Sequence, residues 1–130
     1  MTKIIIAISV LGSLAVGLQA YDQVERIQDM QTMEASMAQV QKGILYNNNK
    51  MVLQGIENLK KASGKVELTE KTDMDYSSKF AKQKAANITK FADKIKTNIE
   101  ANHKHAASAN YTEVLKQCIS CHNKIRKWNQ

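Results

Sequence analysis

Apolar residues recur at helical spacing along most of this chain. Between residues 22 and 46 they are separated by three or four positions, whereas a half-buried strand would alternate apolar and polar residues. The pattern predicts a helix whose inward side chains are Val24, Ile27, Met30, Met33, Met37, Val40 and Ile44.

Asparagine and glycine predict the limits of a second helix. The three asparagines at 47–49 indicate a turn, because Asn tolerates the left-handed conformation and bonds to its own backbone. A helix then runs from about Lys50 to Ala62, and Ser63-Gly64 would end it with Gly in the left-handed position. Residues 64–73 are interpreted as a loop. Val66 and Leu68 alternate with polar residues there, as in a strand, but no partner strand is visible.

A third helix is predicted from about Met74 to Ala101 and a fourth from Asn110 to near Trp128. Asn110 is a good N-cap and Glu113 follows three residues later, so residues 102–110 would form a polar connector. Four helices with short connections predict an all-α fold, an antiparallel four-helix bundle. Its inward residues would include Phe80, Ala81, Ala85, Ile88, Phe91, Ala92, Ile95 and Ile99, and then Tyr111, Val114, Leu115, Cys118 and Ile119.

The first twenty residues have the layout of a secretory signal peptide. Lys3 precedes a stretch of 15 apolar or small residues from Ile4 to Leu18, and charged sequence begins after Ala20. Cleavage after Ala20 would leave residues 21–130 as one domain, although Leu18 is larger than the residue usually preferred at that position. A retained anchor is the alternative, but 15 residues of helix span only about 22 Å against a hydrocarbon core of about 30 Å. The expected location is the bacterial periplasm.

The amino-acid composition argues against several classes of protein for this chain. The chain has 130 residues, no proline and five glycines, which argues against collagen, proline-rich linkers and turn-dense β-sandwiches. Two cysteines are too few for a disulfide scaffold. The net charge of +7 suits an acidic partner. Nucleic acid is not an expected partner, because no recognition motif that combines aromatic and basic residues is present and the chain carries an export signal.

Both cysteines belong to one motif, Cys118-Ile119-Ser120-Cys121-His122. This C-x-x-C-H pattern is typical of covalent attachment of one haem c. Two thiols three residues apart on a helix can each add to a haem vinyl group, and the adjacent His supplies a ligand to the iron. Three other interpretations are a thiol–disulfide redox site, half of a zinc site and chance. They are less favoured, because there is no preceding strand, no second ligand pair at suitable spacing, and no cysteine elsewhere.

The motif lies close to the end of the chain, in the last helix of the predicted bundle, and this placement resembles the class II cytochromes c. The stretch from Cys121 to Arg126 is similar to the family pattern C-H-x-x-aromatic-Arg, with Ile125 departing from the aromatic. The resemblance implies a four-helix bundle with haem on the C-terminal helix, often dimeric through its first two helices. It also nominates Met30, four residues after Arg26, as the residue over the open haem face. In low-spin members a Met there ligates the iron, whereas in cytochrome c-prime proper the residue does not ligate.

Each residue nominated for the haem also has an ordinary interpretation. A thioether is a recognised axial ligand, and Met30, Met33 and Met37 share the predicted inward stripe, with Met33 the second choice as ligand. All three also suit core packing. Arg26 and Arg126 would pair with haem propionates or would be solvated surface residues.

His103 and His105 form a second candidate site. Their His-Lys-His spacing suits a metal, or either one could serve as a distal haem ligand. The favoured interpretation is a solvated connector.

The expected function is single-electron transfer in the periplasm through a haem with His122 and Met30 as iron ligands. The alternative is a five-coordinate haem protein that binds NO or CO. A third hypothesis is a haem-free helical interaction protein with a disulfide. No enzyme is expected, because no paired carboxylates or nucleophile–base set accompanies the motif. The expected partners are redox proteins, acidic ones suiting the charge, and a second copy of the chain, with no stable membrane insertion after cleavage.

Overall fold

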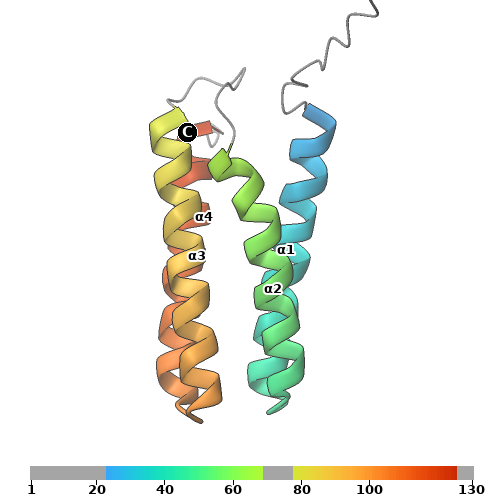
Figure 1. Ribbon diagram of the computed structural model, residues 1–130, viewed down its shortest axis with the longest axis vertical. Coiled ribbons are helices and arrows are strands. Elements are labelled where there is room, and N and C mark those ends of the chain that lie inside the picture. The colour runs from blue at the N-terminus through green and yellow to red at the C-terminus, as the bar shows by residue number, and fades with distance from the viewer. Residues whose placement is uncertain (1–22, 69–77, 126–130) are drawn as a thin grey trace, which may run out of the picture.

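The computed structural model describes residues 23–68 and 78–125. These residues form four α-helices and no strand (Figure 1): α1 (Gln23–Leu45), α2 (Asn49–Leu68), α3 (Ser78–Glu100) and α4 (Lys104–Ile125). Each helix runs opposite to the one before it and packs against it, whereas α1 and α4 touch only slightly. The predicted all-α four-helix bundle is therefore confirmed. Among the described helices, none is long and apolar enough to cross a membrane.

Two turns of the same design close one end of the bundle. Asn47 and Asn102 adopt left-handed backbone conformations, with φ of 55° and 59°. In each turn the next amide donates to the carbonyl five residues back, Asn48 to Gly43 at 2.8 Å and His103 to Asn98 at 2.7 Å. This is the Schellman arrangement, in which Asn can replace Gly. The turn predicted at 47–49 is confirmed, and Lys104 Nζ donates to Asn47 Oδ1 across the two turns.

The predicted end of the second helix at Gly64 is wrong. Helix α2 continues to Leu68, because Gly64 keeps a negative φ and half-buried Val66 packs against the core. The loop predicted for 64–73 is therefore helical as far as residue 68, and the alternation of apolar and polar residues there does not correspond to a strand. Residues 69–73 lie outside the described residues, as do residues 74–77 at the predicted start of the third helix.

The predicted start of the fourth helix is also wrong. Helix α4 begins at Lys104, so most of the connector predicted for 102–110 is helical. The Schellman turn at Asn102 already reverses the chain, and Ala107 is fully buried in the first turns of α4. Asn110 lies inside the helix, where its Nδ2 donates to the Ala106 carbonyl at 2.8 Å, so it is not a cap.

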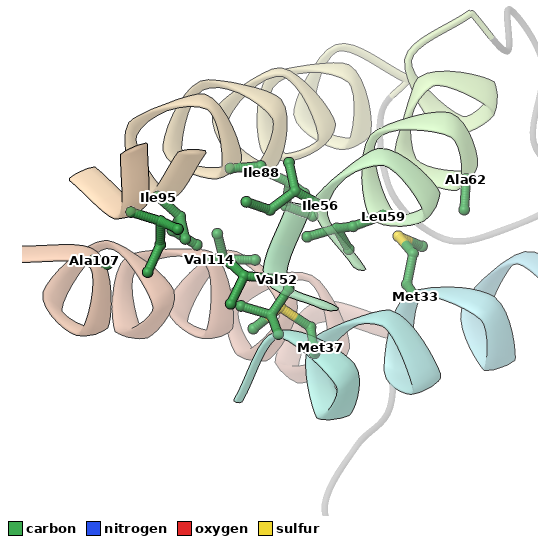
Figure 2. Packing of buried hydrophobic residues seen from close by; sticks show 13 residues of the cluster. Met33, Met37, Val52, Ile56, Leu59, Ala62, Ile88, Ile95, Ala107 and Val114 are labelled. Atoms are coloured by element: carbon green, nitrogen blue, oxygen red, sulfur yellow. The ribbon is translucent and has the colours of Figure 1, made fainter. Parts of the chain in front are cut away.

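Aliphatic side chains from all four helices fill the centre of the bundle (Figure 2). Those predicted inward on α3 are buried, except that Phe80 and Phe91 are half-buried. The first part of the α1 stripe is wrong: Val24, Ile27 and Met30 are exposed. Steps of three residues turn about 60° short of a full turn, so this stripe drifts off the core. The buried core comprises Met33, Met37, Val40, Val52, Ile56, Leu59, Ala62, Ile88, Ala92, Ile95, Ile99, Ala107 and Val114.

Glycine allows α1 and α2 to approach closely. A Cβ atom at Gly43 would lie 2.6 Å from Val52 Cγ2 and 2.8 Å from the Val52 backbone nitrogen. A Cβ atom at Gly55 would lie 2.8 Å from Val40 Cγ2. No atom would lie within 4 Å of a Cβ at Gly64. The first two glycines are therefore packing requirements, and the third is not.

Alanine substitutions at these glycines should have opposite effects. We expect Gly43→Ala to lower the free energy of unfolding by about 1–3 kcal/mol, because the helices must separate. Gly64→Ala should raise it by about 0.5–1 kcal/mol, because Ala favours helix over Gly. Urea unfolding of both variants measures the difference, and a stabilised Gly43→Ala would contradict the close approach.

Candidate functional site

Cys118, Cys121 and His122 lie on the last turns of α4. The helix is continuous through this motif to Ile125, and all three side chains are half-buried. Both thiols are free. Residues three apart on a helix have Cβ atoms about 5–6 Å apart. A disulfide needs about 3.5–4.5 Å. The two sulfurs are separate thiols in this structure, and closing a disulfide would require a local adjustment of the helix.

Helix α3 covers one flank of α4 beside the motif. Gln117 is buried, and its Oε1 accepts hydrogen bonds from Asn87 Nδ2 at 3.2 Å and Lys84 Nζ at 3.4 Å. Lys124 Nζ lies 5.4 Å from the centre of the Phe80 ring. These contacts fix the rotation of α4 about its axis. Sequence reasoning did not find Gln117 or Lys84, because their pairing joins residues 33 positions apart.

The opposite flank of α4 is apolar and only partly covered. Leu115, Cys118 and His122 are spaced by three and four residues, so they share this flank. Ile119 lies beside them and is 48% exposed, and Leu115 is 42% exposed. The next helix on that side is α1, which barely touches α4, and both stand behind α2 and α3 in Figure 1. Cys118 and His122 therefore border an uncovered apolar strip, whereas Cys121 lies nearer α3, where Lys84 affects its pKa.

Burial dominates the electrostatics of the two thiols. It raises the pKa of Cys118, and the neighbouring Cys121 adds to the effect. Burial also raises the pKa of Cys121, which the nearby Lys84 ammonium opposes. The pKa of Tyr111 is raised by burial and by the adjacent Cys118. Tyr111 lies two turns before Cys118 on the same flank of α4. This spacing of seven residues could have predicted from the sequence that the two side chains are neighbours. Both thiols are therefore protonated at neutral pH.

Met30 lies at the same end of the bundle, because α1 begins where α4 ends (Figure 1). We call this the thiol end. Met30 is 36% exposed, whereas Met33 and Met37, on the same side of α1, are each 7% exposed and belong to the core. Packing in the core therefore accounts for Met33 and Met37 but not for Met30. Arg26, one turn before Met30, is half-buried.

A buried carboxylate fixes the rotation of α1 at the thiol end. Asp29 is 4% exposed, and its Oδ1 accepts a hydrogen bond from Lys65 Nζ on α2 at 2.8 Å. This hydrogen bond is the main cause of the raised pKa of Lys65. One residue is about 100° of helix rotation. Met30 is therefore turned away from α2, onto the flank that carries Met37.

The two histidines nominated from the sequence do not lie at the thiol end. His103 and His105 are exposed at the opposite end, and His105 lies roughly 25 Å along α4 from His122. Neither can be a distal ligand to a haem held at Cys118. No cluster of three or more His, Cys, Asp or Glu side chains suited to a metal occurs within residues 23–68 and 78–125. Arg126, Trp128 and the predicted signal peptide lie outside the described residues.

No family model, curated protein or solved structure matches this chain. The resemblance to class II cytochromes c therefore rests on the residues of the motif and on their placement.

Alkylation of the haem-free chain should report the buried thiols. A raised pKa leaves less thiolate at a given pH, so iodoacetamide should react several-fold more slowly in buffer near pH 8 than in urea. The difference should shrink as the pH rises past the folded-state pKa. Mass spectrometry of Cys118→Ser and Cys121→Ser separates the two thiols. Equal rates in a chain that circular dichroism shows to be helical would contradict the burial.

Proposed function

We propose that this protein is an exported, periplasmic c-type cytochrome that carries single electrons through one haem. The haem would be attached at Cys118 and Cys121, with His122 and Met30 as iron ligands. One observation carries the proposal: two separate thiols and an adjacent imidazole stand on a continuous helix beside an uncovered apolar strip, at the end of the bundle where Met30 is also uncovered.

The donor set fits a covalently held haem. The thiols are three residues apart on the helix and both are free, so each is available to react. Ile119 and Leu115 offer apolar surface beside them, which a planar apolar group would remove from water. The slight contact between α1 and α4 leaves this side of the bundle the least filled.

The chain's own residues would act in three ways. Each thiol would add across one vinyl group, so that a carbon–sulfur bond forms and the thiol hydrogen passes to the other vinyl carbon, with no oxidant required. His122 would offer a ring nitrogen to the iron from the helix that holds both thiols. Asp29 and Lys65 would hold α1 in the rotation that presents Met30.

When bound, the haem iron supplies one-electron redox chemistry. His122 and the thioether of Met30 would both hold the iron, and a site held by two protein ligands suits an electron carrier better than a catalyst. The thioether would also raise the reduction potential relative to a nitrogen ligand.

Haem attachment is tested by maturation of the full chain in a bacterial host with c-type haem assembly. We expect one covalent haem per chain, seen as the mass of the purified protein and as haem absorbance that survives denaturation. The same mass should correspond to a chain beginning at Tyr21. Cys118→Ser/Cys121→Ser should carry no covalent haem. A parent chain with no haem would overturn the proposal and favour the haem-free interaction protein.

The role of Met30 is tested against a matched truncation on the same helix. Ile27 is also exposed and lies one turn before Met30 on α1, but its side chain has no atom that can ligate iron. We expect the reduced parent and Ile27→Ala to show sharp low-spin bands that CO does not shift. Met30→Ala should become high-spin and bind CO. Neither truncation removes a core residue, so the fold should survive both.

The same spectra distinguish the proposed function from the alternative, a haem protein that binds NO or CO. A parent protein that is high-spin and shifts at once with CO would have an open distal face. Ligation by Met30 would then be wrong, and binding of NO or CO would replace electron transfer as the function.

A further inference from the structure

Positive charge is concentrated on one half of the bundle. Residues 78–125, which form α3 and α4, contain nine lysines against three acidic residues. Residues 23–68, which form α1 and α2, contain five lysines and one arginine against five acidic residues. The net charges of the two helical hairpins are therefore +6 and +1, so a charged partner would approach α3 and α4 first.

Four of these lysines are gathered around two phenylalanine rings. Lys84 Nζ and Lys124 Nζ each lie 5.4 Å from the centre of the Phe80 ring, one from α3 and the other from α4. Lys90 Nζ and Lys94 Nζ lie 5.9 and 5.4 Å from the centre of the Phe91 ring. Phe80 and Phe91 are eleven residues apart, three turns along one side of α3. We call these six residues the Lys–Phe surface.

The lysines of the Lys–Phe surface have no carboxylate partner among the described residues. The negative faces of the two rings attract the ammonium groups and replace part of the attraction of a counter-ion. Elsewhere, Lys60, Lys65 and Lys116 each form an ion pair with Asp or Glu. The two lysines at each ring are like charges held near one ring without a counter-ion, so a carboxylate brought between them removes an unfavourable interaction as well as making new ones.

We infer that the Lys–Phe surface is the docking site for an acidic face of a partner protein. A lysine held over a ring loses less conformational entropy when it binds a carboxylate than a free side chain does. Nucleic acid suits the surface less well, because stacking needs open ring faces and these faces carry lysines. A lipid surface also suits it less, because both rings are half-buried and do not protrude.

The role of this surface in electron transfer rests on the proposed function. Its position indicates where a redox partner would dock. Lys84 is close enough to Cys121 to affect the pKa of that thiol, and Lys124 follows Cys121 by three residues. The docked partner would therefore meet the bundle beside the proposed haem. Small encounters steered by charge are typical of electron-transfer proteins.

The test uses the full matured chain and an all-glutamate peptide of about 20 residues as the acidic probe. Peptide affinity at low salt is measured for the parent, Lys84→Glu/Lys124→Glu and Lys50→Glu/Lys61→Glu. The last is the matched control, because it makes the same charge change at exposed positions on α2. Haem content is recorded separately for each protein, so failure of haem attachment is distinguishable from failure of docking.

We expect the Lys84/Lys124 variant to bind the peptide at least about tenfold more weakly and the control to change less than about threefold. Amide signals that move on peptide binding should fall within 80–94 and 117–124. Equal weakening in both variants would overturn the inference, because net charge alone would then explain binding. Tighter binding to phosphatidylglycerol vesicles, or to single-stranded DNA of the same charge, would also overturn it.

Discussion

The slight contact between α1 and α4 is the constraint on which the thiol end depends. A helix in a four-helix bundle normally buries two flanks, one against each neighbour. Helix α4 buries only the flank that meets α3, where Gln117 bonds to Asn87 and Lys84. Its other flank keeps Leu115 and Ile119 exposed and leaves the motif half-buried. The apolar strip exists because the bundle does not close on this side.

The two ends of the bundle are held together by different means. At the turn end, a Schellman turn closes each hairpin with satisfied backbone hydrogen bonds, and a side-chain hydrogen bond from Lys104 to Asn47 joins the two hairpins. At the thiol end, a buried carboxylate, Asp29, ties α1 to α2 through Lys65. Charged groups are costly to bury, so such a pair specifies one rotation of the helix more than it adds stability. This suits an end where the orientation of one side chain matters.

Sequence periodicity predicted the number of helices, their antiparallel order and nearly all of the α3 core, because Ala and Ile recur there in alternating steps of four and three residues. It failed at Gly64 and Asn110, residues that end or begin helices when packing is neutral but stay helical when Val66 and Ala107 are buried beside them. It also misplaced Val24, Ile27 and Met30, because consecutive steps of three residues carry a stripe off the side that faces the core. The motif residues were found because their chemistry is local, whereas the contacts of Gln117, Lys84 and Asp29 join distant parts of the chain.

Exposed apolar side chains occur at both ends of the bundle. Exposure alone does not mark a site, because Leu45 and Tyr46 are 70% and 68% exposed at the end closed by the two Schellman turns. At the thiol end, Met30 is left out of a core that accepts Met33 and Met37 on the same side of the helix. Such departures from local consistency are expected at functional sites, since stability is given up there for a group the chain must bind. Under the proposed function, the exposed thioether and the partly covered thiols would belong to one site, which a covalently attached haem would complete.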